Sequence, residues 1–204
     1  MTRLEEIDAL LDFSIDYIGF IFYSKSPRYV LNHLTLEQID AIKHPHKVGV
    51  FVNETLENIR EISEKANLNY IQVHGNETID FITELRKELD DNVKIIKVIR
   101  IGNDLDKVKS ELMNLESKKD AIGFLLFDTD SSSYGGTGNT FDWQILDELD
   151  IPLPYFLSGG ISLENVEKIQ NNTNQPFALD VNSKFELEPG VKDLSKIKEL
   201  KKKI

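Results

Sequence analysis

The chain has 204 residues, of which 40% are hydrophobic and 29% charged, and its net charge is −11 at pH 7. This length suits one domain with a sizeable core, so we predict a single domain over residues 1–204. The acidic balance argues against nucleic acid as a partner, although local donors can still bind a small phosphorylated molecule. The sequence contains no cysteine, which excludes disulfides, thiolate metal sites and thiol catalysis by these residues.

Membranes and metals are also disfavoured as partners. No apolar run approaches the roughly 20 residues that a membrane helix needs, and the first residues lack a signal-peptide pattern. We therefore expect a cytoplasmic protein that does not bind membranes. His33, His44 and His46 lie in or beside one helical pattern, where we expect them to face solvent, and we predict no metal site. The sequence leaves the oligomeric state open.

Short β-rich runs alternate with helical patterns along the whole chain. The runs are nearly continuous in apolar residues, as expected for parallel strands buried on both faces. We predict strands at Tyr17–Phe22, Lys47–Val52, Tyr70–Val73, Lys94–Ile99, Ala121–Phe127, Tyr155–Leu157 and Phe177–Val181. We predict helices at Leu4–Phe13, Leu36–Ile42, Leu56–Ala66, Thr78–Leu89, Leu105–Leu115, Trp143–Leu149, Leu163–Gln170 and Asp193–Lys201. Thr35 with Gln38, and Ser162 with Asn165, have the residue types of helix starts.

This regular alternation predicts parallel βα units with right-handed crossovers. An open doubly wound sheet is the alternative, but it usually has about five or six strands. Seven strands and eight helices favour an α/β fold of the (β/α)8 TIM-barrel type. The first predicted helix has no strand before it, and strand number is tied to barrel closure. We therefore expect the first β-strand of the barrel to be absent from this chain.

Polar residues follow several predicted strands, which is where a (β/α) barrel carries its active site. Asp128 ends one of these strands, and a carboxyl there can act as a general acid; Asp130 is a rival in a more solvated loop. Gly136 lies in the glycine-rich loop that follows, where the backbone can approach or cover a ligand. Arg28 offers a planar guanidinium to a carboxylate. His74 either contacts the ligand or hydrogen-bonds within its own loop.

The loops after the last two predicted strands favour phosphate binding through backbone N–H groups. Gly159 and Gly160 allow the backbone to come close to a ligand in the first of these loops. Asp180 lies near the end of the last predicted strand, and Asn182 and Ser183 can donate from the short loop after it. The alternative is that both segments are ordinary turns.

Several segments, in order from residue 17 to residue 193, resemble the phosphoribosylanthranilate isomerase family. The most specific are Lys25–Tyr29 and Tyr134–Gly138, and the others are Gly19–Ser24, Val48–Val52, Ile71–Gly75, Asp128–Thr129, Phe141–Trp143, Ser158–Gly160 and Pro189–Asp193. The resemblance implies a TIM-barrel isomerase of tryptophan biosynthesis that uses no cofactor. Its reaction is the Amadori rearrangement of N-(5-phosphoribosyl)anthranilate to 1-(2-carboxyphenylamino)-1-deoxyribulose 5-phosphate.

The resemblance also implies roles for individual residues. Asp128 would protonate the furanose ring oxygen as general acid, and Arg28 would bind the anthranilate carboxylate. Phosphate would lie on the loops that contain Gly159 and Asn182. Residues 182–185 are Asn-Ser-Lys-Phe in this chain, where the family more usually has Ser-Ser-Gly-Val. Lys184 either adds a cation near the phosphate or lies on the surface, and the loop need not lose its function.

The family's general base is a cysteine at the end of the first strand, and these 204 residues contain none. Either Met1 is an internal methionine of a longer natural protein, which we favour because the other site residues are present, or the chain has lost its base. Both alternatives predict that this chain is impaired in catalysis and low in stability, or that another chain's edge fills the gap. A non-catalytic binder of phosphorylated anthranilate compounds is a second hypothesis. Isomerisation of a related phosphosugar is a third, disfavoured because no half-chain repeat is visible.

Overall fold

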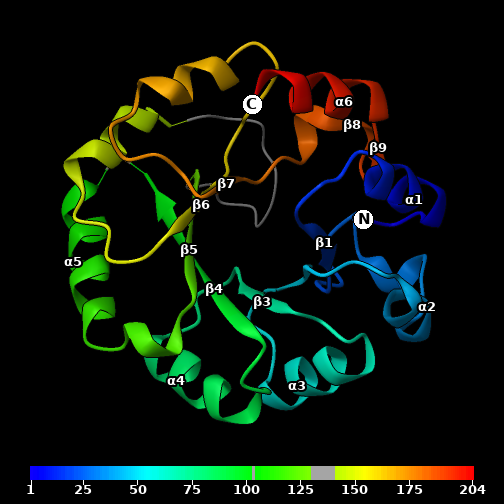
Figure 1. Cartoon of the computed structure of the whole chain (residues 1–204). Helices are drawn as coiled ribbons and strands as arrows, with labels where there is room; N and C mark the ends of the chain where they lie inside the picture. The colour runs from blue at the N-terminus through cyan, green and yellow to red at the C-terminus, as the bar shows by residue number, and fades with distance from the viewer. Residues whose placement is uncertain (103, 130–140) are drawn as a thin grey trace.

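The computed structural model describes residues 1–102, 104–129 and 141–204. Within these ranges seven strands form one parallel sheet, and each pairs with its neighbours in sequence order. They are β1 (Ile18–Ile21), β2 (Lys47–Phe51), β3 (Tyr70–Val73), β4 (Lys94–Ile101), β5 (Phe124–Thr129), β6 (Tyr155–Leu157) and β7 (Ala178–Leu179). Figure 1 shows the sheet curving around a centre with the helices outside it. This arrangement confirms the predicted α/β fold of TIM-barrel type.

Helices cover the outer face of this sheet. The α-helices are α1 (Leu4–Asp12), α2 (Leu36–Ala41), α3 (Leu56–Lys65), α4 (Ile79–Glu88), α5 (Leu105–Glu116) and α6 (Leu194–Lys203). The described residues also contain the 3₁₀ segments η1 (Val30–Asn32), η2 (Lys119–Ala121), η3 (Trp143–Glu148), η4 (Val166–Asn171) and η5 (Ser183–Phe185). A second, antiparallel sheet consists of β8 (Glu186–Glu188) and β9 (Val191–Lys192). No helix in the described part of the chain combines the length and the apolar character needed to cross a membrane.

The sequence predictions hold for element order and fail in some details. The predicted helices at Trp143–Leu149 and Leu163–Gln170 are instead the 3₁₀ segments η3 and η4, each 6 residues long, which is longer than most 3₁₀ segments. The strand predicted from Ala121 begins only at Phe124, because Ala121 still ends the 3₁₀ segment η2. The antiparallel pair β8 and β9 was not predicted.

Two local predictions near the start of the chain have opposite outcomes. Thr35 and Gln38 form the expected reciprocal capping box at the start of α2. The prediction that the histidines face solvent is wrong for His44, which is buried with its Nε2 2.8 Å from the carbonyl oxygen of Ile15. His46 stacks on Tyr17 with the ring centroids 4.7 Å apart. His46 directly precedes β2, and Tyr17 directly precedes β1.

Apolar side chains pack on both faces of the parallel sheet. One cluster lies between the strands and the helices and includes Phe20, Phe51 and Phe127, each fully buried. A second cluster fills the inside of the curved sheet and includes Ile96 and Phe156. Because strand residues alternate between faces, each of β2 to β6 contributes to both clusters, as the continuous apolar runs in the sequence predicted.

Gly49 on β2 is required by close packing. A Cβ atom there would lie 2.5 Å from Cδ1 of Leu68 and 2.8 Å from Cε2 of Phe51. We therefore expect Gly49→Ala to lower the free energy of unfolding by about 1–3 kcal/mol, the usual cost of overpacking. Gly19→Ala on the adjacent strand is the matched control, because nothing lies within 4 Å of a Cβ at Gly19. Urea denaturation should separate the two variants, and equal midpoints would contradict the packing explanation.

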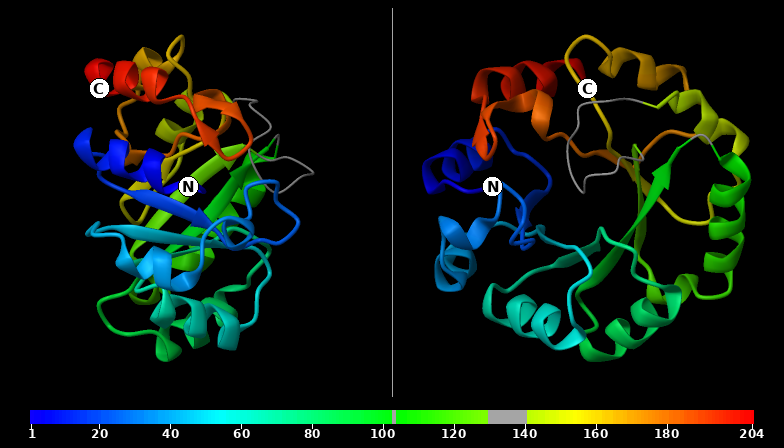
Figure 2. Two further views of the ribbon diagram at one scale, coloured as in Figure 1. Left: turned by 90° about the vertical axis from the view of Figure 1, so that its right-hand side faces the viewer. Right: turned by 180° about the vertical axis from the view of Figure 1, so that it is seen from behind.

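The curved sheet is open between its first and last strands. Among the strands of the described residues, β1 pairs only with β2, and β7 only with β6. The pair β8 and β9 lies on this side together with α1 and α6, which pack against each other and are side by side in both Figures 1 and 2. Polar contacts tie these elements together: the Thr2 hydroxyl donates to the Gly190 carbonyl, and the Lys192 N–H donates to Glu6 at 3.1 Å.

Candidate active site

A single cavity of about 890 Å³ collects the residues that the sequence singled out. It lies at the carboxyl ends of the strands and is lined by Arg28, His74, Asp128, Gly159, Gly160, Asp180, Asn182 and Ser183. Gly136 and Asp130 lie outside the described residues. The cavity continues between β1 and β7, where Gly19 and Leu179 line it. Loops from four strand ends therefore meet in one space, as expected for a barrel active site.

Asp128 lies beside His74 within this cavity. The His74 Nε2 is 3.4 Å from Oδ2 of Asp128, and the two side chains are 12% and 17% exposed. On the other side of the ring, the Gln72 amide donates to Nδ1 at 2.8 Å. This bond leaves the ring proton on Nε2, where it faces the carboxylate. Gln72 on β3 and His74 just after it point to the same side because residues two apart in extended chain do so.

Asp180 is a second carboxyl in the same cavity. Burial and the charge of Asp128 raise the pKa of Asp180 above its usual value, although His74, Lys192 and a hydrogen bond with Ser158 partly oppose this. Beside Asp128, the carboxyl of Asp180 therefore keeps its proton to a higher pH than an isolated aspartate does. Such a proton is what acid catalysis in the cavity requires.

The raised pKa of Asp180 gives a testable dependence of stability on pH. A carboxyl with a raised folded-state pKa costs stability above that pKa and costs nothing below its unfolded value near 3.8. We therefore expect Asp180→Asn to raise the melting temperature at pH 7, and the gain to disappear as the pH falls toward 4. Thermal unfolding across this range checks the sign. A gain that grows as the pH falls would contradict it.

The two loops predicted to bind phosphate both open onto the cavity. Gly159 and Gly160 have φ angles of 91° and 68°, which L-residues with side chains rarely adopt. A Cβ on Gly159 would overlap the hydroxyl of Thr129. In the second loop, Asn182 accepts a hydrogen bond from Nζ of Lys192 at 2.7 Å, and Ser183 begins the 3₁₀ segment η5. The side chain of Asn182 is therefore oriented by a cation that the sequence did not single out.

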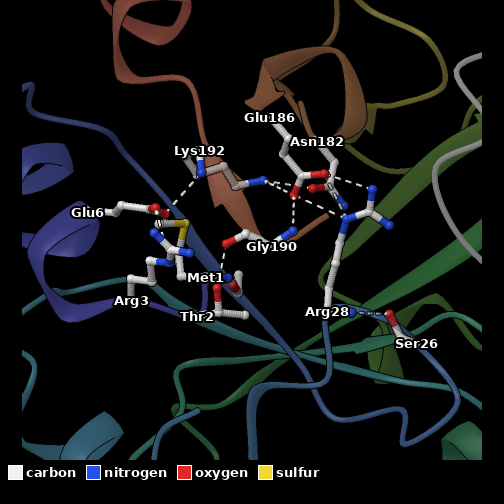
Figure 3. A network of polar contacts seen from close by, with 11 residues as sticks. Met1, Thr2, Arg3, Glu6, Ser26, Arg28, Asn182, Glu186, Gly190 and Lys192 are labelled. Carbon is white, nitrogen blue, oxygen red and sulfur yellow. Dashed lines mark hydrogen bonds and ion pairs between the residues drawn. The ribbon is translucent and has the colours of Figure 1, made fainter. Parts of the chain in front are cut away.

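Arg28 follows β1 and is paired across the open side of the sheet. Its Nε lies 2.9 Å, and its Nη2 2.7 Å, from Oε2 of Glu186 on β8. Lys192 on β9 also contacts this carboxylate, with Nζ 3.0 Å from Oε1. Figure 3 shows Glu186 between the two cations. Sequence reasoning missed Glu186, Lys192 and Gln72; only Gln72 had a usable signal, its position two residues before His74.

Metal ligation finds no support in the described part of the chain. Within residues 1–102, 104–129 and 141–204, no group of three or more His, Asp or Glu side chains is arranged to hold an ion. The groups that line the cavity instead include the carboxyls of Asp128, Asp180 and Glu186, the His74 imidazole, the cations Arg28 and Lys192, and two glycine- or serine-containing loops. These groups can exchange protons and bind anions.

Comparisons with known proteins agree on one family. Residues 1–203 match the family model described as N-(5'phosphoribosyl)anthranilate (PRA) isomerase. The N-(5'-phosphoribosyl)anthranilate isomerase of Caldanaerobacter subterraneus is 40% identical over 206 residues, covering 100% of this chain and 94% of the relative. That of Parabacteroides distasonis is 39% identical, covering 96% of this chain and 85% of the relative.

Solved structures give the same result. The crystal structure of phosphoribosyl anthranilate isomerase from Thermotoga maritima is 31% identical, has a TM-score of 0.80, and is matched over 97% of this chain and 92% of that one. A second isomerase structure, in complex with reduced 1-(o-carboxyphenylamino)-1-deoxyribulose 5-phosphate, is 29% identical with a TM-score of 0.76, covering 99% and 93% of the two chains. The chain therefore belongs to the N-(5'-phosphoribosyl)anthranilate isomerase family.

Proposed function

We propose that this chain carries out the reaction of its family, the Amadori rearrangement of N-(5'-phosphoribosyl)anthranilate in tryptophan biosynthesis. One observation supports this most strongly. One cavity, in a chain of this family, is lined by Asp128, by Arg28 and by the two loops predicted to bind phosphate. These groups were predicted from separate parts of the sequence. A cytoplasmic location stays a prediction of the sequence.

Asp128 is the general acid of the proposed reaction. It protonates the furanose ring oxygen, so the C1′–O bond breaks and the nitrogen lone pair forms a Schiff base at C1′. A base then removes the C2′ proton, and the enolamine that results becomes the ketone. His74 orients the Asp128 carboxyl through Nε2, and Asp180 provides the neighbouring carboxyl whose pKa is raised. The sequence contains no cysteine to act as the base.

The other cavity residues bind the two anionic ends of the substrate. The backbone N–H groups around Gly159, Gly160 and Ser183 bind the phosphate, since their loops approach the ligand from two neighbouring strands. Gly136 lies outside the described residues, and its contact with the substrate stays a prediction of the sequence. Arg28 binds the anthranilate carboxylate through a charge-assisted hydrogen bond.

The experiment that tests this function is turnover of N-(5'-phosphoribosyl)anthranilate by the purified chain, followed as loss of substrate fluorescence. Loss faster than the spontaneous decay, and inhibited by the reduced carboxyphenylamino analogue, is the expected result. Loss at the spontaneous rate with tight binding of the analogue, both in this chain and in a chain extended by a strand that ends in Cys-Gly, would replace the isomerase with a non-catalytic binder. The absence of both turnover and analogue binding would contradict the isomerase and the binder hypotheses alike.

A further inference from the structure

Glu186 holds both cations on the open side of the cavity. Its side chain is only 3% exposed, and it accepts hydrogen bonds from Arg28, from Lys192 and from the N–H of Gly190 at 3.2 Å. Burial works to raise the pKa of Glu186, but the hydrogen bonds from Arg28 and the charge of Lys192 outweigh it and hold this pKa below its usual value. Glu186 is therefore ionised, and its oxygens are fully engaged.

The contact leaves one edge of the Arg28 guanidinium available. Nε and Nη2 both point at the Glu186 carboxylate. Among the described residues no hydrogen bond from Nη1 is recorded, and Arg28 lines the cavity with its side chain 13% exposed. Because the guanidinium is planar, fixing Nε and Nη2 also fixes the direction of Nη1.

The cluster of Arg28, Lys192 and Glu186 carries an excess of one positive charge. Two cations share one carboxylate, so Glu186 cannot neutralise both. Lys192 is itself oriented by Asn182, its second acceptor, at 2.7 Å. A substrate with one carboxylate would bring this cluster to neutrality.

We propose that Glu186 is a positioning residue that clamps Arg28 and Lys192 into one carboxylate-binding site. The proposal rests on the proposed function, since it concerns the anthranilate end of that substrate. It differs from a role in holding the fold together, because clamping affects how well the site distinguishes a ligand with a carboxylate from one without.

The test compares two ligands by titration calorimetry on the full chain. One is the reduced carboxyphenylamino analogue, and the other is the same molecule with a phenyl ring that lacks the carboxylate. We expect the unsubstituted chain to prefer the first by about 30-fold, the value of a charge-assisted hydrogen bond. In Glu186→Gln we expect this preference to fall about tenfold, while affinity for the second ligand stays within about twofold. Glu186→Asp keeps the negative charge on a shorter side chain, so it should restore part of the preference for the ligand with the carboxylate.

Glu188→Gln is the matched control. It removes the same charge from the same strand, β8, but its side chain is 69% exposed, 3.7 Å from Arg3 and outside the cavity. Its ligand preference should equal that of the unsubstituted chain. Equal weakening of both ligands in Glu186→Gln would show that Glu186 only supports the fold. A rise in the preference would show that Glu186 merely competes with the substrate for Arg28. Either result overturns the proposal.

A second measurement does not depend on whether a Glu186 variant folds. The Nε–H signal of Arg28 in the unsubstituted chain, assigned by its loss in Arg28→Lys, should keep its position when the carboxyphenylamino analogue binds. A large shift would mean that the ligand displaces Glu186, which would overturn the proposal. If neither ligand binds the unsubstituted chain, the proposed function fails instead, so the two failures are distinguishable.

Discussion

Adding a strand that ends in Cys-Gly directly ahead of Met1 is expected to raise turnover by about 10²–10⁴-fold, the usual contribution of a general base. About eight extended residues ahead of Met1 would be long enough to form this strand. The Met1 amine lies on the cavity and hydrogen-bonds to the Gly19 carbonyl of β1. A thiolate two residues earlier would therefore enter the cavity between the unpaired edges of β1 and β7.

The same strand ending in Ser-Gly is the matched control for chemistry. It should supply the backbone pairing without the thiolate, so turnover should stay near that of the 204-residue chain. Equal rates for the Cys-Gly and Ser-Gly chains would mean that another residue removes the C2′ proton.

Both extended chains should also be more stable, by about 2 kcal/mol or more, because edges are paired and apolar side chains buried.

Burial and the charge of Lys192 lower the pKa of the Met1 amine to about 5. The folded chain therefore gives up a proton that the unfolded chain keeps below pH 8, and this costs stability. An added strand replaces that amine by an amide, so the gain in melting temperature should be larger at pH 6 than at pH 8. Equal melting temperatures with and without the strand would contradict the prediction.

Asp128→Asn is expected to lower kcat by about 10²–10⁴-fold, because the amide cannot protonate the ring oxygen. KM should change little, since Arg28 and the phosphate loops bind the substrate. The decrease should be measured as substrate fluorescence loss in both the 204-residue chain and the Cys-Gly chain. A decrease in kcat/KM caused by KM alone would assign Asp128 to binding and would require a different acid.

His74→Gln provides the comparison for this variant. It removes the imidazole that faces Asp128 and leaves the carboxyl itself in place. A positioning role predicts a smaller loss of kcat than in Asp128→Asn, together with an altered pH profile. Equal losses would make His74 itself a proton donor.

The sequence was sufficient for features that depend on local pattern. Continuous apolar runs predicted all seven strands, and two of them, at Tyr70–Val73 and Tyr155–Leu157, match the structure in both bounds. Residues such as Asp128 and Arg28 could be selected because they follow strands, and parallel strands bring their carboxyl ends together. Helix type was less predictable: η3 and η4 have apolar spacing that suits either an α-helix or a 3₁₀ turn.

Contacts between distant segments could not be predicted in this way. Glu186 lies in a short stretch before a Pro-Gly turn, and it forms its ion pair with Arg28, which is 158 residues away in the sequence. Lys192 was part of a recognised motif but had no assigned role until its Nζ was located beside Glu186. The burial of His44 likewise depends on the carbonyl of Ile15, which no periodicity in the sequence indicates.

The open side of the sheet also determines the order in which the molecule can assemble. Each strand pairs with the next one along the chain, so most of the sheet can grow by short loop closures. The contacts of Thr2 with Gly190 and of Glu6 with Lys192 instead join residues 188 and 186 positions apart. Such distant pairs form late, because their loop entropy is lost before other contacts compensate it. Partly folded chains would thus contain a nearly complete sheet and still lack the carboxylate-binding cluster.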